Sequence, residues 1–345
     1  MKNSTYNVIG VMAGSSMDGL DIALVEFELI SGSWKFELKK GVTKPYNDQL
    51  IFQLENSSWL SHADKLELDT HFGEWISQQI LEVSDFWNAD LIAVHGHTVI
   101  HEPENGISWQ LGRGEIIAKK CNVTTITDYR TEDIRLGGQG APLVPFGDFV
   151  LFDQYDACLN LGGICNVSVR ESHLAWDICP CNQVLNFFAK KLGKEYDRDG
   201  LLARQGKLDQ GFYDHLSSFD FFSKPPPKSL ANNYLRDQLL SDINPYDGLF
   251  TYTHFIVDQI SESLSDKGSR LLVTGGGANN KYLIEILMER LTDWEVEIPS
   301  QDIVDFKEAI IFGFLGVKRF RNEVNVLSSA TGASKDSSSG VIHLP

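Results

Sequence analysis

Alternating apolar and polar positions at the start of the chain predict three consecutive strands. They cover residues 6–12, 20–29 and 34–38. Apolar residues at helical spacing from Phe72 to Val83 then predict an amphipathic helix, and Ser61 and Asp64 are placed upstream of it as a capping pair. A buried strand at 91–95 follows and runs into the polar tetrapeptide H-G-H-T.

The same order of elements returns in the second half of the chain. Three strands are predicted at 157–161, 164–169 and 174–177. A helix follows Pro180 and stops at Gly193. No repeat is visible residue by residue, so the repeated order of hairpin, strand and helix is what predicts two related α/β domains joined near 142–147. We expect the first domain over 1–145, with part of the C-terminal segment as a candidate to complete it, and the second over 146–345.

A further strand-to-helix turn is predicted towards the C-terminal end. The buried strand 271–274 runs into G-G-G-A-N-N and then into a helix that includes Leu283 and Leu287. Another apolar helix is predicted at 308–320. The segment S-K-P-P-P-K-S at 223–229 cannot continue a helix and predicts an extended loop.

The composition is typical of a soluble globular protein and narrows the class of function. Of the 345 residues, 42% are hydrophobic and 11% aromatic, which excludes disordered, collagen-like and disulfide-scaffold proteins. The charge of −17, from 30 Lys+Arg against 47 Asp+Glu, repels a phosphate backbone, so we expect no nucleic-acid partner. The sequence shows no long apolar run and no leader pattern, so we expect no membrane partner and a cytoplasmic location. The five cysteines lack paired C-x-x-C spacing, which predicts reduced thiols rather than disulfides or structural zinc.

Three glycine-rich turns are candidates for phosphate or nucleotide binding. The turn in G-V-M-A-G-S-S-M-D-G-L-D-I-A at 10–23 is not a P-loop, because it lacks Lys and a strand follows it. Its N–H groups and hydroxyls can still surround phosphate, while Asp18 or Asp21 holds a hydrated Mg²⁺. The second turn lies in N-L-G-G-I-C-N-V-S at 160–168, and the third is G-G-G at 275–277, where a nucleotide ring could lie against backbone. Ordinary tight turns are the alternative for each segment taken alone.

Two polar segments and one carboxylate are candidates for substrate binding and catalysis. H-G-H-T-V-I-H-E-P at 95–103 lacks the spacing of a metal site, which favours hydrogen bonding to hydroxyls. In the segment 128–145, Arg130 is the candidate for planar, bidentate capture of an acid. Asp177 ends a strand, where a carboxylate tends to face the ligand crevice, and is a candidate general base. Helix capping or a structural hydrogen bond is the alternative for Asp177.

Six motifs together make the sequence resemble one family. They are, in chain order, G-V-M-A-G-S-S-M-D-G-L-D, H-G-H-T-V-I-H-E-P, D-Y-R-x-x-D, G-G-Q-G-A-P-L-V-P, N-L-G-G-I-C-N-V and V-T-G-G-G-A-N-N. The sequence resembles the anhydro-N-acetylmuramic acid kinases, within the sugar kinase, actin and Hsp70 ATPase superfamily. The matches run in order from about residue 8 to 335, which is nearly the whole chain.

The resemblance implies an α/β fold of two ribonuclease-H-like (actin-like ATPase) domains with an interdomain cleft that closes, and commonly a homodimer. It also implies an ATP-dependent enzyme of cell-wall recycling. Such enzymes open 1,6-anhydro-N-acetylmuramic acid with water and phosphorylate the released O6, giving N-acetylmuramic acid 6-phosphate. Because ATP is the electrophile for the departing O6, one carboxylate suffices as the catalytic base, and the resemblance places it at Asp177.

Ligand positions follow from the resemblance and the glycine-rich turns together. The residues expected to bind ATP are Gly14, Ser15, Ser16, Met17, Asp18, Gly19, Leu20, Asp21, Asn160, Gly162, Gly163, Gly275, Gly276, Gly277 and Asn279. Asp18 and Asp21 would hold Mg²⁺ with water between. Arg130 would bind the lactyl carboxylate of the substrate. The residues expected on the hydroxyls and amide of the substrate are His97, Thr98 and Asp133.

A few positions depart from the family pattern. S-G-T-S becomes A-G-S-S, so Ala13 lacks a hydroxyl, and H-G-Q-T becomes H-G-H-T through His97. D-T-G-P-G-N becomes D-I-C-P-C-N, in which Cys179 and Cys181 replace glycines and are expected to bring bulk towards the sugar or phosphate. Two alternatives therefore stay open: a kinase of another sugar or acid on the same fold, and a non-catalytic nucleotide-binding regulatory module.

Overall fold

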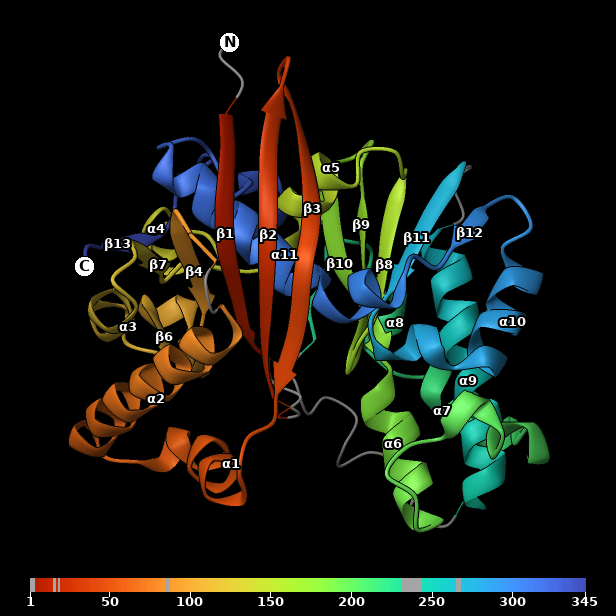
Figure 1. Cartoon of the computed structure of the whole chain (residues 1–345). Coiled ribbons are helices and arrows are strands. Elements are labelled where there is room, and N and C mark those ends of the chain that lie inside the picture. Colours follow the sequence, from red (N-terminus) through yellow and green to blue (C-terminus); the bar gives the residue numbers. More distant parts are fainter. Residues whose placement is uncertain (1–3, 15–16, 18, 85–86, 231–242, 265–267) are drawn as a thin grey trace. The chain divides into compact units, whose positions relative to one another are not determined.

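The computed structural model describes residues 4–14, 17, 19–84, 87–230, 243–264 and 268–345 (Figure 1). The chain forms two compact units. The first comprises Met1–Phe152 and Phe306–Pro345, and the second comprises Asp153–Asp305. The division therefore falls after Phe152 rather than at 145, and the C-terminal segment from Phe306 onward belongs to the first unit.

A mixed six-stranded sheet forms the centre of the first unit, in the order β13-β7-β4-β1-β2-β3. Its strands are β1 (Ser4–Ala13), β2 (Leu20–Ile30), β3 (Ser33–Lys44), β4 (Leu91–His95), β7 (Thr125–Thr127) and β13 (Val341–His343). The neighbours β1, β2 and β3 are antiparallel, whereas β4 runs parallel to β1 and β7 runs parallel to β4. A separate two-stranded sheet pairs β5 (His97–Glu102) with β6 (Ile107–Leu111).

Successive side chains of a strand point to opposite sides of a sheet. In this six-stranded sheet, helices cover both sides. Ile9 and Val11 of β1 pack into a core with α2. On the other face Gly10 meets α11, and a Cβ on Gly10 would overlap the Ala309 carbonyl. Every residue of α11 from 309 to 317 is buried, as in a helix that is apolar all round. Covering this face of the sheet is the physical reason why the C-terminal segment belongs to the first unit.

The helices that contribute to the first unit are α1 (Asp48–Glu55), α2 (His62–Val83), α3 (Gly114–Cys121), α4 (Thr131–Arg135), α5 (Val144–Leu151), α11 (Gln301–Phe320) and α12 (Ser328–Thr331), with the short 3-10 helices η1 (Ser57–Trp59) and η2 (Pro103–Asn105). The expected cap of α2 is confirmed. The Ser61 hydroxyl accepts the Asp64 N–H at 3.2 Å and donates to the Asp64 carboxylate at 2.7 Å. Helix α11 begins at Gln301, earlier than the expected start at 308.

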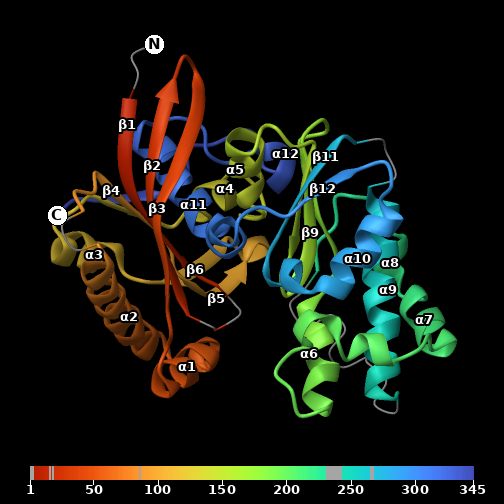
Figure 2. The same ribbon diagram turned by 45° about the vertical axis from the view of Figure 1, so that its right-hand side comes forward.

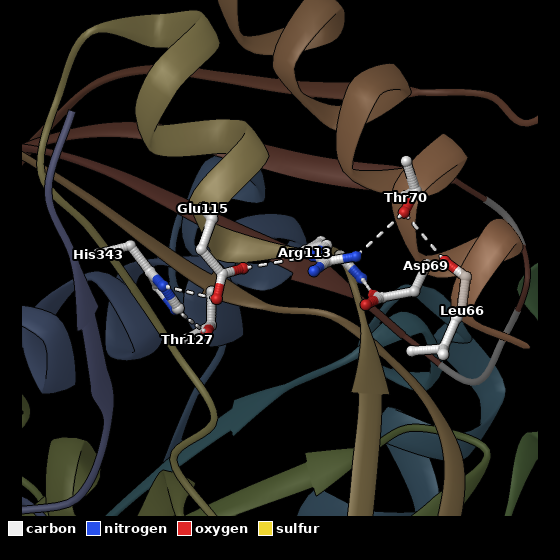
Figure 3. A network of polar contacts seen from close by, with 8 residues as sticks. Leu66, Asp69, Thr70, Arg113, Glu115, Thr127 and His343 are labelled. Carbon is white, nitrogen blue, oxygen red and sulfur yellow. Dashed lines mark hydrogen bonds and ion pairs between the residues drawn. The ribbon is translucent and has the colours of Figure 1, made fainter.

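A polar network ties the C-terminal strand β13 to α2 and α3 (Figure 3). The Nε2 atom of His343 lies 2.9 Å from the Thr127 hydroxyl of β7, and its Nδ1 lies 3.6 Å from the Glu115 carboxylate. Arg113 connects Glu115 to Thr70 of α2. The edge strand β13 is therefore held by side chains as well as by its antiparallel pairing with β7.

The second unit is built on a five-stranded sheet in the order β10-β9-β8-β11-β12. Its strands are β8 (Ala157–Leu161), β9 (Ile164–Val169), β10 (Leu174–Pro180), β11 (Arg270–Thr274) and β12 (Glu295–Glu297). The neighbours β8, β9 and β10 are antiparallel, whereas β11 runs parallel to β8 and β12 to β11. In the first unit, the strands in the order β3-β2-β1-β4-β7 show the same pattern of two antiparallel pairings followed by two parallel pairings. This is the ribonuclease-H-like arrangement, so the expected fold class of two such α/β domains is confirmed.

The helices of the second unit are α6 (Asn182–Lys191), α7 (Gln210–Ser217), α8 (Asp220–Ser223), α9 (Pro245–Ser263) and α10 (Lys281–Arg290), with the short 3-10 helices η3 (Arg198–Gly200), η4 (Ala203–Gln205) and η5 (Gly276–Asn279). Figure 2 shows α9 and α10 beside the sheet, and their apolar side chains share one buried core with its strands. Within the described residues, no helix of either unit is long and apolar enough to cross a bilayer.

Candidate active site

Asp177 lies towards the end of β10, next to a β-bulge. It pairs with Asn166 of β9, but the next pair is Cys179 with Cys165, which leaves Ile178 as the extra residue. In a regular strand, Asp177 and Cys179 would face the same side. The bulge breaks this alternation, so Ile178 and Cys179 are both fully buried while Asp177 is only half-buried. The local backbone thus buries the apolar neighbours and leaves the carboxylate partly open to solvent.

The Asp177 carboxylate is held by one of its two oxygens. Oδ2 accepts hydrogen bonds from the Leu230 N–H at 2.8 Å and from the Ser229 hydroxyl at 3.2 Å. Within the described part of the chain, no hydrogen bond reaches Oδ1. Burial raises the pKa of Asp177, and the two hydrogen bonds oppose that rise. A fixed carboxylate with a raised pKa and one open oxygen is suited to take a proton from water.

Cys179 and Cys181 follow Asp177 in sequence, but their side chains point into the core. Both are fully buried in the apolar cluster of the second unit. The Tyr252 hydroxyl, from the same cluster, donates to the Pro180 carbonyl between them at 2.7 Å. All five cysteines are free thiols, as their spacing predicts. The expectation that these thiols bring bulk towards the ligand is therefore corrected, because the bulk fills the core instead.

The turn between β8 and β9 is tied to the start of α6. The N–H groups of Cys181 and Asn182 donate to the carbonyls of Gly163 and Gly162, at 2.8 and 3.1 Å. The Asn182 side chain also donates to the Leu161 carbonyl at 2.9 Å. This glycine-rich turn is therefore fixed beside the end of β10, the strand that carries Asp177.

The G-G-G turn after β11 packs against the same place. Gly275 has φ +83°, and a Cβ on Gly275 or Gly277 would collide with the end of β8, where Asn160 lies. Gly276 is exposed, and a Cβ there would meet another side chain only at 3.7 Å. Two of the three glycines therefore serve close packing, while Gly276 and the exposed Asn279 leave a surface for a ligand. The structure thus brings together both predicted glycine turns of the second unit.

The turn between β1 and β2 lies only partly within the described residues. Of its expected ligand positions, Gly14, Met17, Gly19, Leu20 and Asp21 are described, whereas Ser15, Ser16 and Asp18 lie outside the described residues. Asp21 and Thr43 are cross-strand neighbours, and the Thr43 hydroxyl donates to the Asp21 carboxylate at 2.6 Å. This contact fixes Asp21 at the base of the turn. In the parts of the chain that the structure describes, no group of three or more His, Cys, Asp or Glu side chains is arranged to hold a metal ion.

Arg130 is a half-buried cation of the first unit. Its Nη1 donates to the Gly140 carbonyl at 2.6 Å and its Nη2 donates to His95 Nε2 at 2.8 Å. Because a guanidinium only donates, His95 accepts through Nε2 and carries its proton on Nδ1. Burial lowers the pKa of Arg130 to about 10, and the charges of Glu308 and Asp128 oppose this shift. A half-buried guanidinium whose direct hydrogen bonds go to neutral acceptors is suited to bind an anion.

Asp133 is placed differently from the other expected substrate residues. It is fully buried, and its two oxygens accept hydrogen bonds from the Gly140 N–H at 2.8 Å and the Thr331 hydroxyl at 2.7 Å. This geometry therefore does not favour direct contact between Asp133 and a substrate hydroxyl. Asp133 instead fixes the Gly140 peptide, whose carbonyl accepts from Arg130.

His97 and Thr98 begin β5, in a tightly packed stretch of backbone. A Cβ on Gly96 would overlap the Leu111 carbonyl of β6, which explains the glycine of H-G-H-T. His97 is buried and hydrogen-bonded to the Leu54 backbone, and burial lowers the pKa of His97. Thr98 is half-buried. Of this pair, Thr98 is the side chain with surface to offer a ligand.

Comparison with known proteins decides the family. The family model described as anhydro-N-acetylmuramic acid kinase matches residues 6–345. This chain belongs to the anhydro-N-acetylmuramic acid kinase family. The relative of that name from Synechocystis sp. is 36% identical, over 97% of this chain and 98% of the relative. Those from Zymomonas mobilis and Hydrogenovibrio crunogenus are 30% and 32% identical, each over at least 97% of both chains. The identification made from the six motifs is confirmed.

Several supporting residues of this family member have no local signal in the sequence. Ser229 and Leu230 hold Asp177, and His95 and Gly140 hold Arg130. H-G-H-T belongs to one of the six motifs, and Ser229 ends the predicted loop at 223–229, but nothing in their spacing shows which side chain they contact. These partners follow only from the fold.

Replacing His97 with Gln, which the family pattern carries at this position, is expected to make the free energy of unfolding less sensitive to acid. The unfolded chain binds a proton at His97 near pH 6.5, whereas the folded protein keeps this ring neutral to lower pH. The contribution of His97 to the free energy of unfolding is therefore complete above pH 6.5. At lower pH this contribution decreases by up to about 1.4 kcal/mol per pH unit. Urea unfolding of both proteins at pH 7.5 and 5.5 measures the difference, and equal losses would contradict the expectation.

Proposed function

We propose that this chain is an ATP-dependent kinase that opens 1,6-anhydro-N-acetylmuramic acid with water and phosphorylates O6. The observation that carries the proposal is Asp177: a half-buried carboxylate at a strand end, with a raised pKa, one oxygen held and the other open. Family membership supplies the substrate, because the relatives are named for it.

The proposed reaction needs one base and no separate acid. Asp177 takes a proton from water as the water oxygen forms a bond to the anomeric carbon. The bond between that carbon and O6 breaks, and O6 bonds to the γ-phosphorus of ATP, which releases ADP. Because the phosphoryl group captures the electron pair of O6, no proton donor is required there. The proton passes from Asp177 to solvent after the product leaves.

ATP would be held by the three glycine-rich turns. Backbone N–H groups of such turns bind phosphate oxygens, and the exposed Gly276 and Asn279 offer surface for the nucleotide. Asp21, with Asp18 outside the described residues, would hold a hydrated Mg²⁺, and a carboxylate fits the preference of Mg²⁺ for oxygen ligands. When bound, Mg²⁺ neutralises the phosphate charge that opposes attack by O6.

A homodimer and a cytoplasmic location belong to the same proposal. The homodimer is supported by what the family resemblance implies. Light scattering on the purified protein tests the dimer, with twice the chain mass of 38.6 kDa as the expected value.

The alternative of a different sugar substrate loses its main motive. It rested on Cys179 and Cys181, whose bulk was expected near the ligand. Since both side chains are fully buried in the core, they add no bulk to the exposed surface beside Asp177. The alternative of a non-catalytic module is also disfavoured. Asp177, the carboxylate that the reaction needs, is present and held by hydrogen bonds.

Replacing Arg130 with Met is expected to raise the KM for the anhydro sugar by about 10- to 100-fold, since a charge-assisted hydrogen bond to the lactyl carboxylate is lost. The KM for ATP should change little. Steady-state kinetics with 1,6-anhydro-N-acetylmuramic acid and with 1,6-anhydro-N-acetylglucosamine, which lacks the lactyl group, measures the effect. Wild type should prefer the first sugar, and Arg130→Met should lose that preference.

Arg135→Met is the matched control for this experiment. Arg135 lies in α4 a few residues from Arg130, but its side chain is exposed and pairs with Glu132 at 3.0 Å. Kinetics like those of wild type are expected for Arg135→Met. If Arg130→Met kept the wild-type preference between the two sugars, Arg130 would not be the carboxylate-binding residue.

A further inference from the structure

The segment Lys228–Ser229–Leu230, which we call the strap, meets Asp177 from a distant part of the sequence. The Asp177 N–H donates to the Lys228 carbonyl at 2.9 Å. The Leu230 N–H and the Ser229 hydroxyl then donate to Asp177 Oδ2, at 2.8 and 3.2 Å. Both the backbone and the side chain of Asp177 are therefore tied to this one short segment.

The two donors of the strap reach the same carboxylate oxygen. A free carboxylate can rotate and present either oxygen, so two donors on Oδ2 remove that freedom. Oδ1 receives no hydrogen bond within the described residues. The strap therefore decides which oxygen of Asp177 is left to accept a proton.

The strap has an anchor of its own that does not involve Asp177. The Lys228 ammonium donates to the carbonyls of Phe221 and Phe222 at the end of α8, at 3.2 and 3.3 Å. It also lies 4.7 Å from the centre of the Phe221 ring, and Phe221 is buried. Loss of the Ser229 hydroxyl would therefore leave the strap in place, since Lys228 and the backbone bonds remain.

Resting on the proposed function, we propose that Ser229 is a positioning residue: together with the Leu230 N–H it holds Asp177 Oδ2, so that Oδ1 is the proton acceptor of the reaction. The Ser229 hydroxyl also stabilises the ionised carboxylate, because a donor bonds the charged form more strongly than the neutral one. The pH range over which Asp177 acts as a base therefore depends on Ser229.

Within the described residues, few other titratable groups surround Asp177. On β9 and β10 these are the thiols of Cys165 and Cys179, which are fully buried. Burial raises the pKa of Cys165 well above its ordinary value, so that thiol stays neutral in the working range. On the strap it is Lys228, whose ammonium is turned to the carbonyls at the end of α8. A change in the titration of Asp177 on removing the Ser229 hydroxyl is therefore assigned to the lost hydrogen bond.

The test compares wild type with Ser229→Ala and Ser229→Thr over pH 5 to 9. A base works only when ionised, so kcat falls as pH decreases through the pKa of Asp177. In Ser229→Ala this fall is expected roughly 0.5–1 pH unit higher, with kcat about three- to tenfold lower at pH values on the acid side of the fall and an unchanged KM for the sugar. Ser229→Thr keeps a hydroxyl and is expected to restore the wild-type profile. Ser229 is exposed, so these variants are expected to fold.

Two further measurements make the result decisive. Ser223→Ala is the matched control, because the Ser223 hydroxyl is exposed and donates to the Asp220 carbonyl, away from Asp177. Titration of the ¹³C-labelled Asp177 carboxyl by NMR reports its pKa without any need for turnover, and the same upward shift is expected in Ser229→Ala. Coincident profiles and titrations in wild type and Ser229→Ala, or a loss that Ser229→Thr does not restore, would overturn the inference. Lack of sugar turnover in wild type would instead overturn the proposed function, with the NMR titration still deciding whether Ser229 holds Asp177.

Discussion

Asp177→Asn is expected to lower kcat for phosphorylation of 1,6-anhydro-N-acetylmuramic acid by about 10³-fold or more, while ATP binding stays largely intact. The amide oxygen can replace Oδ2 and keep the hydrogen bonds from Leu230 and Ser229, so the shape of the site is preserved. The NH₂ group then stands where the proton acceptor is needed. A coupled assay of ADP release measures the loss, and calorimetry with ATP checks that binding is kept.

Asp214→Asn is the matched control for this variant. Asp214 lies in α7 of the same unit, is exposed and accepts a hydrogen bond from Gln210 at 2.8 Å. It is expected to retain wild-type turnover. Undiminished turnover in Asp177→Asn would remove Asp177 from the role of base and leave the proposed reaction without one.

Gly10→Ala is expected to destabilise the first unit by about 3 kcal/mol or more, at the upper end of what overpacking usually costs. The added methyl group would overlap the Ala309 carbonyl of α11, and it would also approach the Gly313 N–H at 3.2 Å. These neighbours are backbone atoms of a buried helix, which cannot rotate away as a side chain can. Urea unfolding followed by circular dichroism measures the change in the free energy of unfolding.

Gly211→Ala separates this effect from a general effect of removing glycine. Gly211 is exposed in α7, and its nearest contact for a new Cβ is the Asp209 carboxylate at 3.5 Å. Alanine is favoured over glycine inside a helix, so a stability equal to wild type or higher by up to about 1 kcal/mol is expected. If Gly10→Ala were as stable as wild type, α11 would not pack on β1 as described.

Strands were the part of the fold that the sequence predicted best. The strands at 91–95, 157–161 and 164–169 begin and end where they were expected, because each is a short, mostly buried run bounded by turn or polar residues. Helix α11 shows the limit of such patterns. Its first turns, Q-D-I-V-D-F-K-E, are rich in charge, so the apolar spacing becomes visible only near 308 although the helix begins at Gln301.

Long-range relations were beyond the reach of local patterns. The repeated order of elements predicts two α/β domains, and each unit is built on its own sheet. Nothing in the spacing shows that the segment from Phe306 returns to the first unit, since this follows from the need to cover the Gly10 face of its sheet. The same holds for Asp133, for which the resemblance implied a substrate contact although its oxygens are used by Gly140 and Thr331.

The site was predicted by residue type and completed by the fold. Asp177 stands out as a carboxylate at a strand end and Arg130 as a guanidinium in a polar segment, because such groups are chemically conspicuous. Their partners Ser229 and His95 do not, because a hydrogen bond between residues far apart in sequence leaves no trace in local composition. The sequence therefore predicts which groups react, and the structure shows which groups hold them.

Mass spectrometry of the product formed from the anhydro sugar and ATP in ¹⁸O-labelled water tests the role of water most directly. The account predicts N-acetylmuramic acid 6-phosphate with one ¹⁸O atom in the sugar and none in the phosphoryl group. Unlabelled product incubated in the same water corrects for exchange at the anomeric carbon. A phosphorylated sugar without label, or with the label in its phosphoryl group, would contradict attack of water on the sugar.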